Sequence, residues 1–191
     1  MSAGAAPTDF TNQFLIAMPG MADDQFAGTV VYVCEHTPQG ALGLVVNKPI
    51  DINLANLFEK VDLPLDEPAL AAQPVYFGGP VQTERGFVLH EPRDDTFMST
   101  LNVPGGLAMT TSKDVLEAMA AGQGPRRVLV TLGYCGWSAG QLEREIGHNG
   151  WLTVTAEPAV IFDLPPEARY QGALNLLGVD ARMLSKDAGH A

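Results

Sequence analysis

A strand-to-helix connection constrains the fold of this 191-residue chain more than any other feature of its sequence. Residues 127–132 form a strongly apolar run, and a glycine-rich connection follows at 133–137. Ser138 stands three positions before Gln141, which is the spacing of a capping box at the start of a helix. We therefore predict a buried strand at 127–132, a tight connection, and a helix at 138–146 that packs against a sheet.

The remaining segments alternate between short strands and helices. Runs of β-branched and aromatic residues bounded by turn residues predict strands, and apolar residues three and four apart predict helices. Hairpins come first and helices later, so we predict one α/β domain of the mixed α+β kind, a curled sheet with helices outside it. The expected strands are 29–34, 42–46, 75–77, 86–90, 97–101, 107–110, 151–155 and 160–162, and the further helices are 53–60, 115–121 and 166–177.

Nothing in the composition divides the chain into two domains. We expect a flexible tail at 1–11, one domain at 12–182 and a second tail at 183–191. The first residues lack the basic and apolar regions of a signal peptide, and no run reaches the roughly eighteen apolar residues of a membrane span. These observations favour a cytoplasmic protein in which Cys34 and Cys135 are reduced.

The charge balance excludes several classes of partner. The chain has 11 Lys and Arg residues against 22 Asp and Glu residues, and its net charge is −11. Proteins that bind nucleic acids or anionic membranes need basic residues to contact phosphate groups, so we expect neither partner. Charged residues make up only 17% of the chain. The surface must therefore contain much uncharged polar or apolar area, which favours self-association, so a homo-oligomer is among the partners that we consider.

Several segments resemble the AlgH/YqgE family of bacterial proteins. Together they span about residues 12–180, and they are FLIAMP at 14–19, GALGLVVNKP at 40–49, YFGGPV at 76–81, TTSKDVL at 110–116, the segment 133–143, and NGWL at 149–152. The resemblance implies a single mixed α/β domain with a barrel-like sheet. It implies no particular reaction, and the regulator label of one branch of the family implies no DNA-reading element in these residues.

Cys135 is the candidate catalytic residue. Placed between a strand and a helix start, its thiol would have a lowered pKa, because backbone N–H groups and the helix dipole stabilise a thiolate. The pattern approaches a nucleophile elbow, in which glycines stand two before and two after the nucleophile, but Trp137 occupies the second position. A thiol nucleophile needs a base, for which His36 and His148 are the candidates. The alternative interpretation is a buried thiol in a tight turn.

The candidate ligand-binding residues lie in two places. Thr111, Ser112 and Lys113 combine hydroxyls, a helix start and a lysine, which is a pattern that can hold a carboxylate or phosphate. Gly136 and Trp137 are expected to border a pocket near Cys135. The alternatives are a simple helix cap and a tryptophan in the core. No zinc-type cysteine cluster, Walker lysine or Rossmann fingerprint is present, so we expect no metal and no cofactor.

These observations favour a non-enzymatic regulatory domain that binds a protein or a small molecule. The alternative is a cysteine-dependent hydrolase or transferase centred on Cys135, with His36 or His148 as its base. A DNA-binding transcriptional regulator is the least favoured of the three hypotheses, because the chain is acidic.

Overall fold

The computed structural model of the chain describes residues 8–19, 26–94 and 97–179. Most of the expected N-terminal tail and the expected tail at 183–191 lie outside the described residues. Residues 8–11 are described, and Phe10 among them is buried against the domain. Its ring stacks on His36, with ring centroids 5.4 Å apart.

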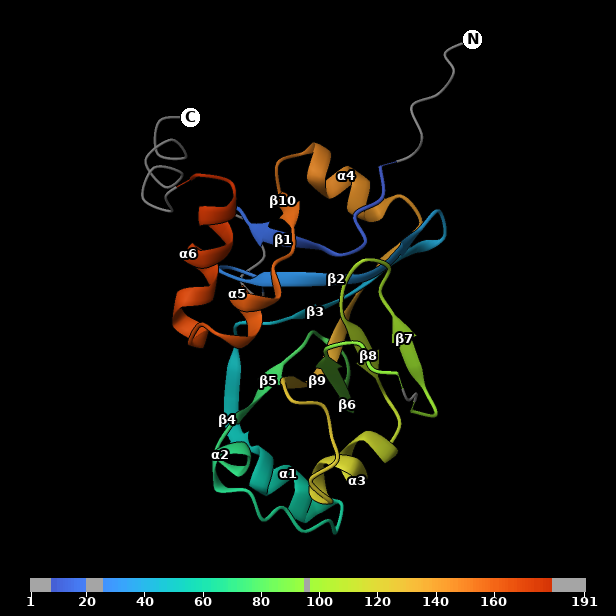
Figure 1. The fold of residues 1–191 in the computed structure, drawn as a ribbon. Helices are drawn as coiled ribbons and strands as arrows, with labels where there is room; N and C mark the ends of the chain where they lie inside the picture. Colours follow the sequence, from blue (N-terminus) through green and yellow to red (C-terminus); the bar gives the residue numbers. More distant parts are fainter. Residues whose placement is uncertain (1–7, 20–25, 95–96, 180–191) are drawn as a thin grey trace.

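The described residues form one α/β domain around a curled sheet (Figure 1). The strands are β1 Gln13–Ala17, β2 Val30–Thr37, β3 Gly40–Val45, β4 Pro49–Asn53, β5 Pro74–Phe77, β6 Val81–His90, β7 Thr100–Asn102, β8 Ala108–Thr110, β9 Val128–Ser138 and β10 Trp151–Thr155. The helices are α1 Leu54–Lys60, α2 Pro68–Ala71, α3 Asp114–Ala120, α4 Gln141–Gly147, α5 Pro158–Phe162 and α6 Pro166–Leu176. The predicted fold class is confirmed.

The sheet has the strand order β10-β1-β2-β3-β9-β6-β8-β7, and β4 and β5 branch from it at β9. The predicted hairpins are present, because β2 pairs with β3 and β7 pairs with β8 in antiparallel register. The predicted helix at 53–60 is also confirmed, and Asn53 caps it through a capping box with Asn56. Strand β9 joins the two halves of the sheet, since it pairs with β3, β5 and β6.

Two glycines allow the sheet to curl at the middle of β9. A Cβ atom on Gly79 would lie 2.1 Å from the backbone carbon of Tyr134, and one on Gly133 would lie 2.2 Å from the carbonyl oxygen of Gly79. Both glycines have positive φ angles, 156° for Gly79 and 81° for Gly133. The two backbones therefore approach more closely than any other residue type allows. This close contact requires glycine at both positions.

Two of the predicted elements are wrong. The connection at 133–137 is strand, because β9 continues to Ser138 and pairs there with β3. Helix α4 begins only at Gln141, after Gly140 takes a left-handed conformation. The predicted strand at 160–162 belongs to α5, which Pro158 opens at its first position. A run of three apolar residues has no period, so its sequence did not distinguish a helix from a strand.

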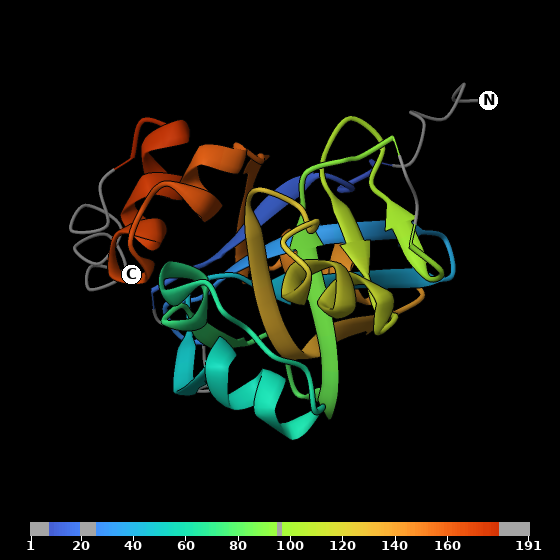
Figure 2. The same ribbon diagram turned by 60° about the horizontal axis from the view of Figure 1, so that its bottom comes forward.

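Three apolar clusters fill the spaces between the sheet and the helices. Helix α4 covers β9 and β10, α5 and α6 pack against β9, β1 and β2, and α1 and α3 cover the opposite end of the sheet (Figures 1 and 2). Within the described part of the chain, no helix combines the length and hydrophobicity required to cross a membrane.

Candidate functional site

Cys135 is a core residue in the middle of a strand. Only 1% of its surface is exposed, and its thiol donates a hydrogen bond to the carbonyl oxygen of Gly78 at 3.5 Å. It packs in an apolar cluster with Leu15, Trp137 and Trp151. Burial raises the pKa of the Cys135 thiol to about 12, which is the opposite of the lowered pKa expected beside a helix start. That expectation is wrong because α4 begins six residues after Cys135.

His36 lies on β2 and is held by partners other than Cys135. Its Nδ1 atom accepts a hydrogen bond from the backbone N–H of Phe10 at 3.0 Å. Nδ1 therefore acts as an acceptor, and Nε2 lies 3.2 Å from Oε2 of Glu143. The geometry of this contact is not that of a hydrogen bond, so Nε2 of His36 has no hydrogen-bond partner among the described residues. The pKa of Glu143 is lowered, because its own backbone N–H and the His36 ring stabilise the carboxylate.

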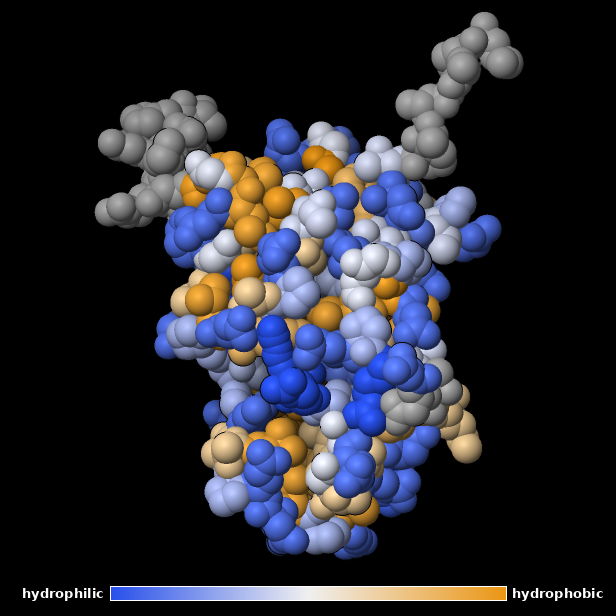
Figure 3. Space-filling model, in the orientation of Figure 1, coloured by the Kyte–Doolittle hydropathy of each residue, from blue (hydrophilic) through white to orange (hydrophobic). Residues whose placement is uncertain are grey.

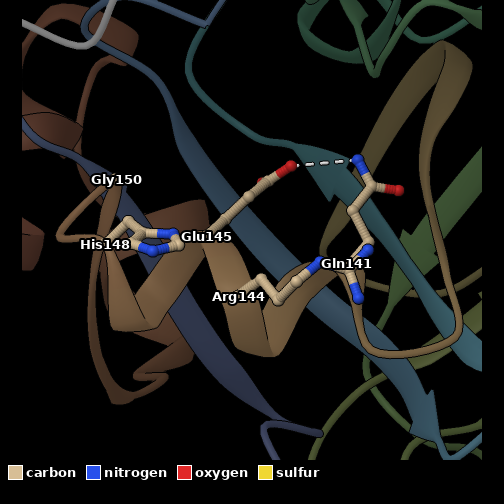
Figure 4. A pocket seen from close by; sticks show the side chains of 5 residues that line it. All are labelled: Gln141, Arg144, Glu145, His148 and Gly150. Atoms are coloured by element: carbon tan, nitrogen blue, oxygen red, sulfur yellow. Dashed lines mark hydrogen bonds between the residues drawn. The ribbon is translucent and has the colours of Figure 1, made fainter.

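His148 is exposed at the C-terminal end of α4. With Gln141, Arg144, Glu145 and Gly150 it lines a surface cavity of about 340 Å³ (Figure 4). Cys135 does not line this cavity. Among the described residues, no hydrogen bond joins Cys135 to a histidine, so the structure does not assemble the predicted nucleophile and base.

Trp137 is buried, and its indole N–H donates a hydrogen bond to a carboxylate. Oε1 of Glu145 accepts hydrogen bonds from the indoles of Trp137 at 3.0 Å and Trp151 at 2.9 Å. Its Oε2 atom accepts from the side-chain amide of Gln141 at 2.9 Å, as Figure 4 shows. Gly136 is exposed and pairs with Leu42 in the sheet. The core alternative for Trp137 is therefore the one that the structure supports.

The other predicted ligand residues, Thr111, Ser112 and Lys113, lie directly before helix α3. The hydroxyl of Ser112 donates a hydrogen bond to Oδ1 of Asp114 and accepts one from the backbone N–H of Ser99 at 3.0 Å. Oδ2 of Asp114 accepts from the backbone N–H of Met98 at 2.7 Å. A carboxylate of the protein itself thus occupies the first turn of α3. The expected anion position at Thr111, Ser112 and Lys113 is therefore not supported.

The same three residues line a groove of about 250 Å³ between α1, α3 and the sheet, at the end of the molecule that faces forward in Figure 2. No motif in the sequence indicates this groove, because its walls come from four separate segments. Gly86 on β6 was its one local signal, since an isolated glycine inside a strand marks a close approach or a gap. A Cβ atom there would meet only one neighbouring atom, at 4.0 Å. The remaining lining residues are Leu57, Val61, Glu84, Val88, Thr110, Val115, Leu116, Val130 and Leu132.

The fold and these cavities define a single-domain α/β protein with a half-barrel sheet. The family model described as AlgH-like matches residues 14–182, and the chain belongs to this family. A UPF0301 protein of Cupriavidus metallidurans and one of Ralstonia nicotianae are each 65% identical to it over 191 residues, which is 100% of both chains in each comparison.

Two solved structures resemble the fold. The solution structure of the AlgH protein from Pseudomonas aeruginosa has 52% sequence identity and a TM-score of 0.78, and the match covers 98% of this chain and 99% of that chain. The crystal structure of protein DIP2367 from Corynebacterium diphtheriae has a TM-score of 0.67 at 19% identity, covering 90% of this chain and 88% of that chain. At 19% identity the second likeness concerns the fold alone.

Proposed function

We propose that this protein is a non-enzymatic domain that binds a small ligand with an apolar body in the groove between α1 and α3. The observation that carries this proposal is the partial exposure of aliphatic side chains along a concave surface. Leu57, Leu116 and Leu132 line the groove and are only half-buried. Binding of an apolar ligand would remove this surface from water, which is the main source of affinity in small-molecule sites.

The rim of the groove supplies polar contacts for one end of the ligand. Lys113 and Glu84 are exposed and carry opposite charges, and Thr111 lies between the apolar wall and solvent. A few polar groups at the edge of an apolar groove are typical of sites that fix the orientation of a ligand. The preferred polar end of the ligand therefore depends on which of the two charges it reaches.

The alternative functions have less support. A thiol enzyme requires a thiolate near a free base, whereas Cys135 is buried with a raised pKa and Nδ1 of His36 already accepts a hydrogen bond. A DNA-binding regulator requires a basic surface, and the chain has a net charge of −11. A regulatory effect would then follow from ligand-dependent contacts with another protein in the cytoplasm.

The test uses three probes that share one apolar body and differ in their polar end: hexanoate, hexanol and hexylamine. We expect at least one of them to shift the backbone NMR signals of groove residues saturably. A preference for hexanoate would assign Lys113 to the polar end, and a preference for hexylamine would assign Glu84. If none of the three probes perturbs the groove at millimolar concentration, the proposal is wrong.

Gly86→Leu should block the groove. The φ angle of Gly86 is one that other residues adopt and its Cβ position is open, so we expect the variant to fold with a stability change below about 1 kcal/mol. We expect at least about tenfold weaker probe binding, which corresponds to the loss of about 1.4 kcal/mol of contact. Gly147→Leu is the matched control, because its Cβ position is also open but lies on α4. Equal loss of binding in both variants would contradict the assignment of the site.

A further inference from the structure

Arg169 on α6 is a charged side chain in the interior of the molecule. Only 6% of its surface is exposed. Its Nε atom donates a hydrogen bond to the carbonyl oxygen of Leu164 at 3.0 Å, and Nη1 donates to the carbonyl oxygen of Val46 at 2.6 Å. The guanidinium lies over the ring of Tyr76, 5.1 Å from its centroid. Both oxygen partners are neutral, so the buried positive charge has no counter-charge among these contacts.

A buried arginine normally pairs with a carboxylate, because removing an uncompensated charge from water is strongly unfavourable. Among the described residues, no carboxylate lies within 4.0 Å of the Arg169 guanidinium. A guanidinium has five N–H donors, and the two carbonyls use two of them. Three N–H groups thus stay available to an acceptor from outside the protein. Such an acceptor has to reach them through an opening, and the structure provides one.

Arg169 borders a pocket of about 200 Å³ that two further arginines line. Arg126 and Arg127 reach it from the loop before β9, and no acidic side chain lines it. The pocket therefore gathers three of the chain's eleven Lys and Arg residues. Figure 3 shows a strongly hydrophilic patch at the middle of the face that it draws, below the C-terminal helices.

The charge of one of these arginines is partly balanced. Nε of Arg127 lies 3.7 Å from a carboxylate oxygen of Glu91, and Nη1 lies 3.4 Å from one of Asp163. Solvent screens both contacts, because the side chains of Glu91 and Asp163 are 46% and 59% exposed. The Arg127 guanidinium also lies over the ring of Phe162, 5.3 Å from its centroid, which holds it beside the pocket. Arg126 is exposed and has no ion pair among the described residues.

We propose that this pocket binds a phosphate group, either as the free anion or on a small organic molecule. A phosphate carries up to two negative charges and several acceptor oxygens. It can therefore accept paired hydrogen bonds from more than one guanidinium group, which a single carboxylate cannot do as well. Ile161 and Phe162 offer an apolar wall to an organic substituent. The remaining protein is strongly acidic and repels anions, so affinity for phosphate has to arise locally from these arginines.

The first experiment titrates the full-length protein with inorganic phosphate at constant ionic strength and follows backbone NMR signals. We expect saturable shifts confined to residues around the pocket, with a Kd of about 1 mM or tighter. Phenyl phosphate forms the second arm: tighter binding than phosphate would assign an organic carrier, and equal binding would assign the free anion. Shifts that sodium chloride reproduces, or that do not saturate, would overturn the proposal.

Arg126→Gln tests the site without disturbing the fold, because Arg126 is exposed. We expect about tenfold weaker phosphate binding, since a charge-assisted hydrogen bond contributes at least that factor. Arg85→Gln is the matched control, which removes one exposed arginine that does not line the pocket. Arg169→Lys keeps the positive charge but removes the paired N–H donors of the guanidinium, so it should weaken phosphate binding further. Circular dichroism checks that this variant is folded. Unchanged phosphate affinity in Arg126→Gln and in folded Arg169→Lys would refute the site.

Discussion

His36 shows how one backbone partner fixes the chemistry of a side chain. The N–H of Phe10 donates to Nδ1, so the lone pair of that nitrogen is already engaged in a hydrogen bond. The ring side chain is only 5% exposed, and Phe10 stacks on it. These contacts make His36 a fixed part of the packing between β2 and the segment that precedes β1, and they leave it no lone pair with which to accept a proton from a nucleophile.

We predict that Cys135 resists alkylation in the native protein. With a pKa of about 12, only about one Cys135 thiol in ten thousand is ionised at pH 8, and burial also blocks the reagent. Iodoacetamide followed by peptide mass spectrometry should therefore modify Cys135 at least about 100-fold more slowly than free cysteine. In guanidinium chloride the two rates should become similar. Rapid modification of Cys135 in the folded protein would restore the thiol-enzyme hypothesis.

Helix α4 is held to the sheet by the buried side chain of Leu142 and by the carboxylate of Glu145. The helix has only seven residues, and an isolated helix of that length is not stable in water. Glu145 compensates by accepting hydrogen bonds from the indoles of Trp137 on β9 and Trp151 on β10. The two indole rings themselves pack edge to face, with centroids 6.3 Å apart. The position of α4 therefore depends on side chains from two strands that are not adjacent in the sheet.

Glu145→Ala should destabilise the protein by about 3 kcal/mol. The substitution removes the acceptor of two half-buried indole N–H groups and one amide, and an unsatisfied buried donor costs about 1–3 kcal/mol. Urea denaturation followed by tryptophan fluorescence measures the change, because both tryptophans lie at this contact. Arg144→Ala is the control, since Arg144 is exposed on the same helix. Equal stability of the two variants would show that the carboxylate does not hold α4.

Burial of proton-donating groups couples the stability of the whole molecule to alkaline pH. The pKa values of Cys34, Cys135 and Tyr32 are all raised, chiefly by burial. Above pH 9 the unfolded chain loses thiol protons that the folded protein keeps, so the unfolded state binds fewer protons and the free energy of unfolding falls as pH rises. The stabilisation is complete below the unfolded pKa and is lost progressively as pH approaches the folded pKa.

We therefore predict that the free energy of unfolding falls by up to about 1.4 kcal/mol per pH unit for each ionising thiol between pH 9 and pH 11. Urea unfolding at several pH values measures this slope. Cys135→Ala should reduce the slope by the contribution of one group, although the variant is less stable at every pH because it leaves a cavity. An unfolding free energy that stays constant over this range would contradict the burial of both thiols.

Much of the fold was predictable because it follows from local patterns. The hairpin of β2 and β3, the helix capped by Asn53, and the pairing of β7 with β8 were each indicated by periodicity and turn residues. The prediction at 133–137 failed because its glycines serve a contact with Gly79, which is distant in sequence. Local patterns cannot distinguish a glycine required by a turn from one required by a neighbouring strand.

The candidate sites were less predictable than the fold. Thr111, Ser112 and Lys113 were predicted to hold an anion, whereas the structure places them along a groove that no sequence motif indicated, and the carboxylate of Asp114 lies at the helix start itself. The arginine pocket joins α6 to the loop before β9, about forty residues apart in the chain. No spacing rule connects such segments, because side chains from different elements meet only after the chain has folded.

The sequence by itself determined the fold class, the net negative charge, and most strands and helices, because these depend on composition and on periods of two to four residues. The tertiary structure alone decided that Cys135 is buried in the core, that a groove lies beside Gly86, and that Arg169 lines a pocket. Each of these features depends on how far the side chain is buried from water. Burial in turn depends on which distant segments the folded sheet brings together.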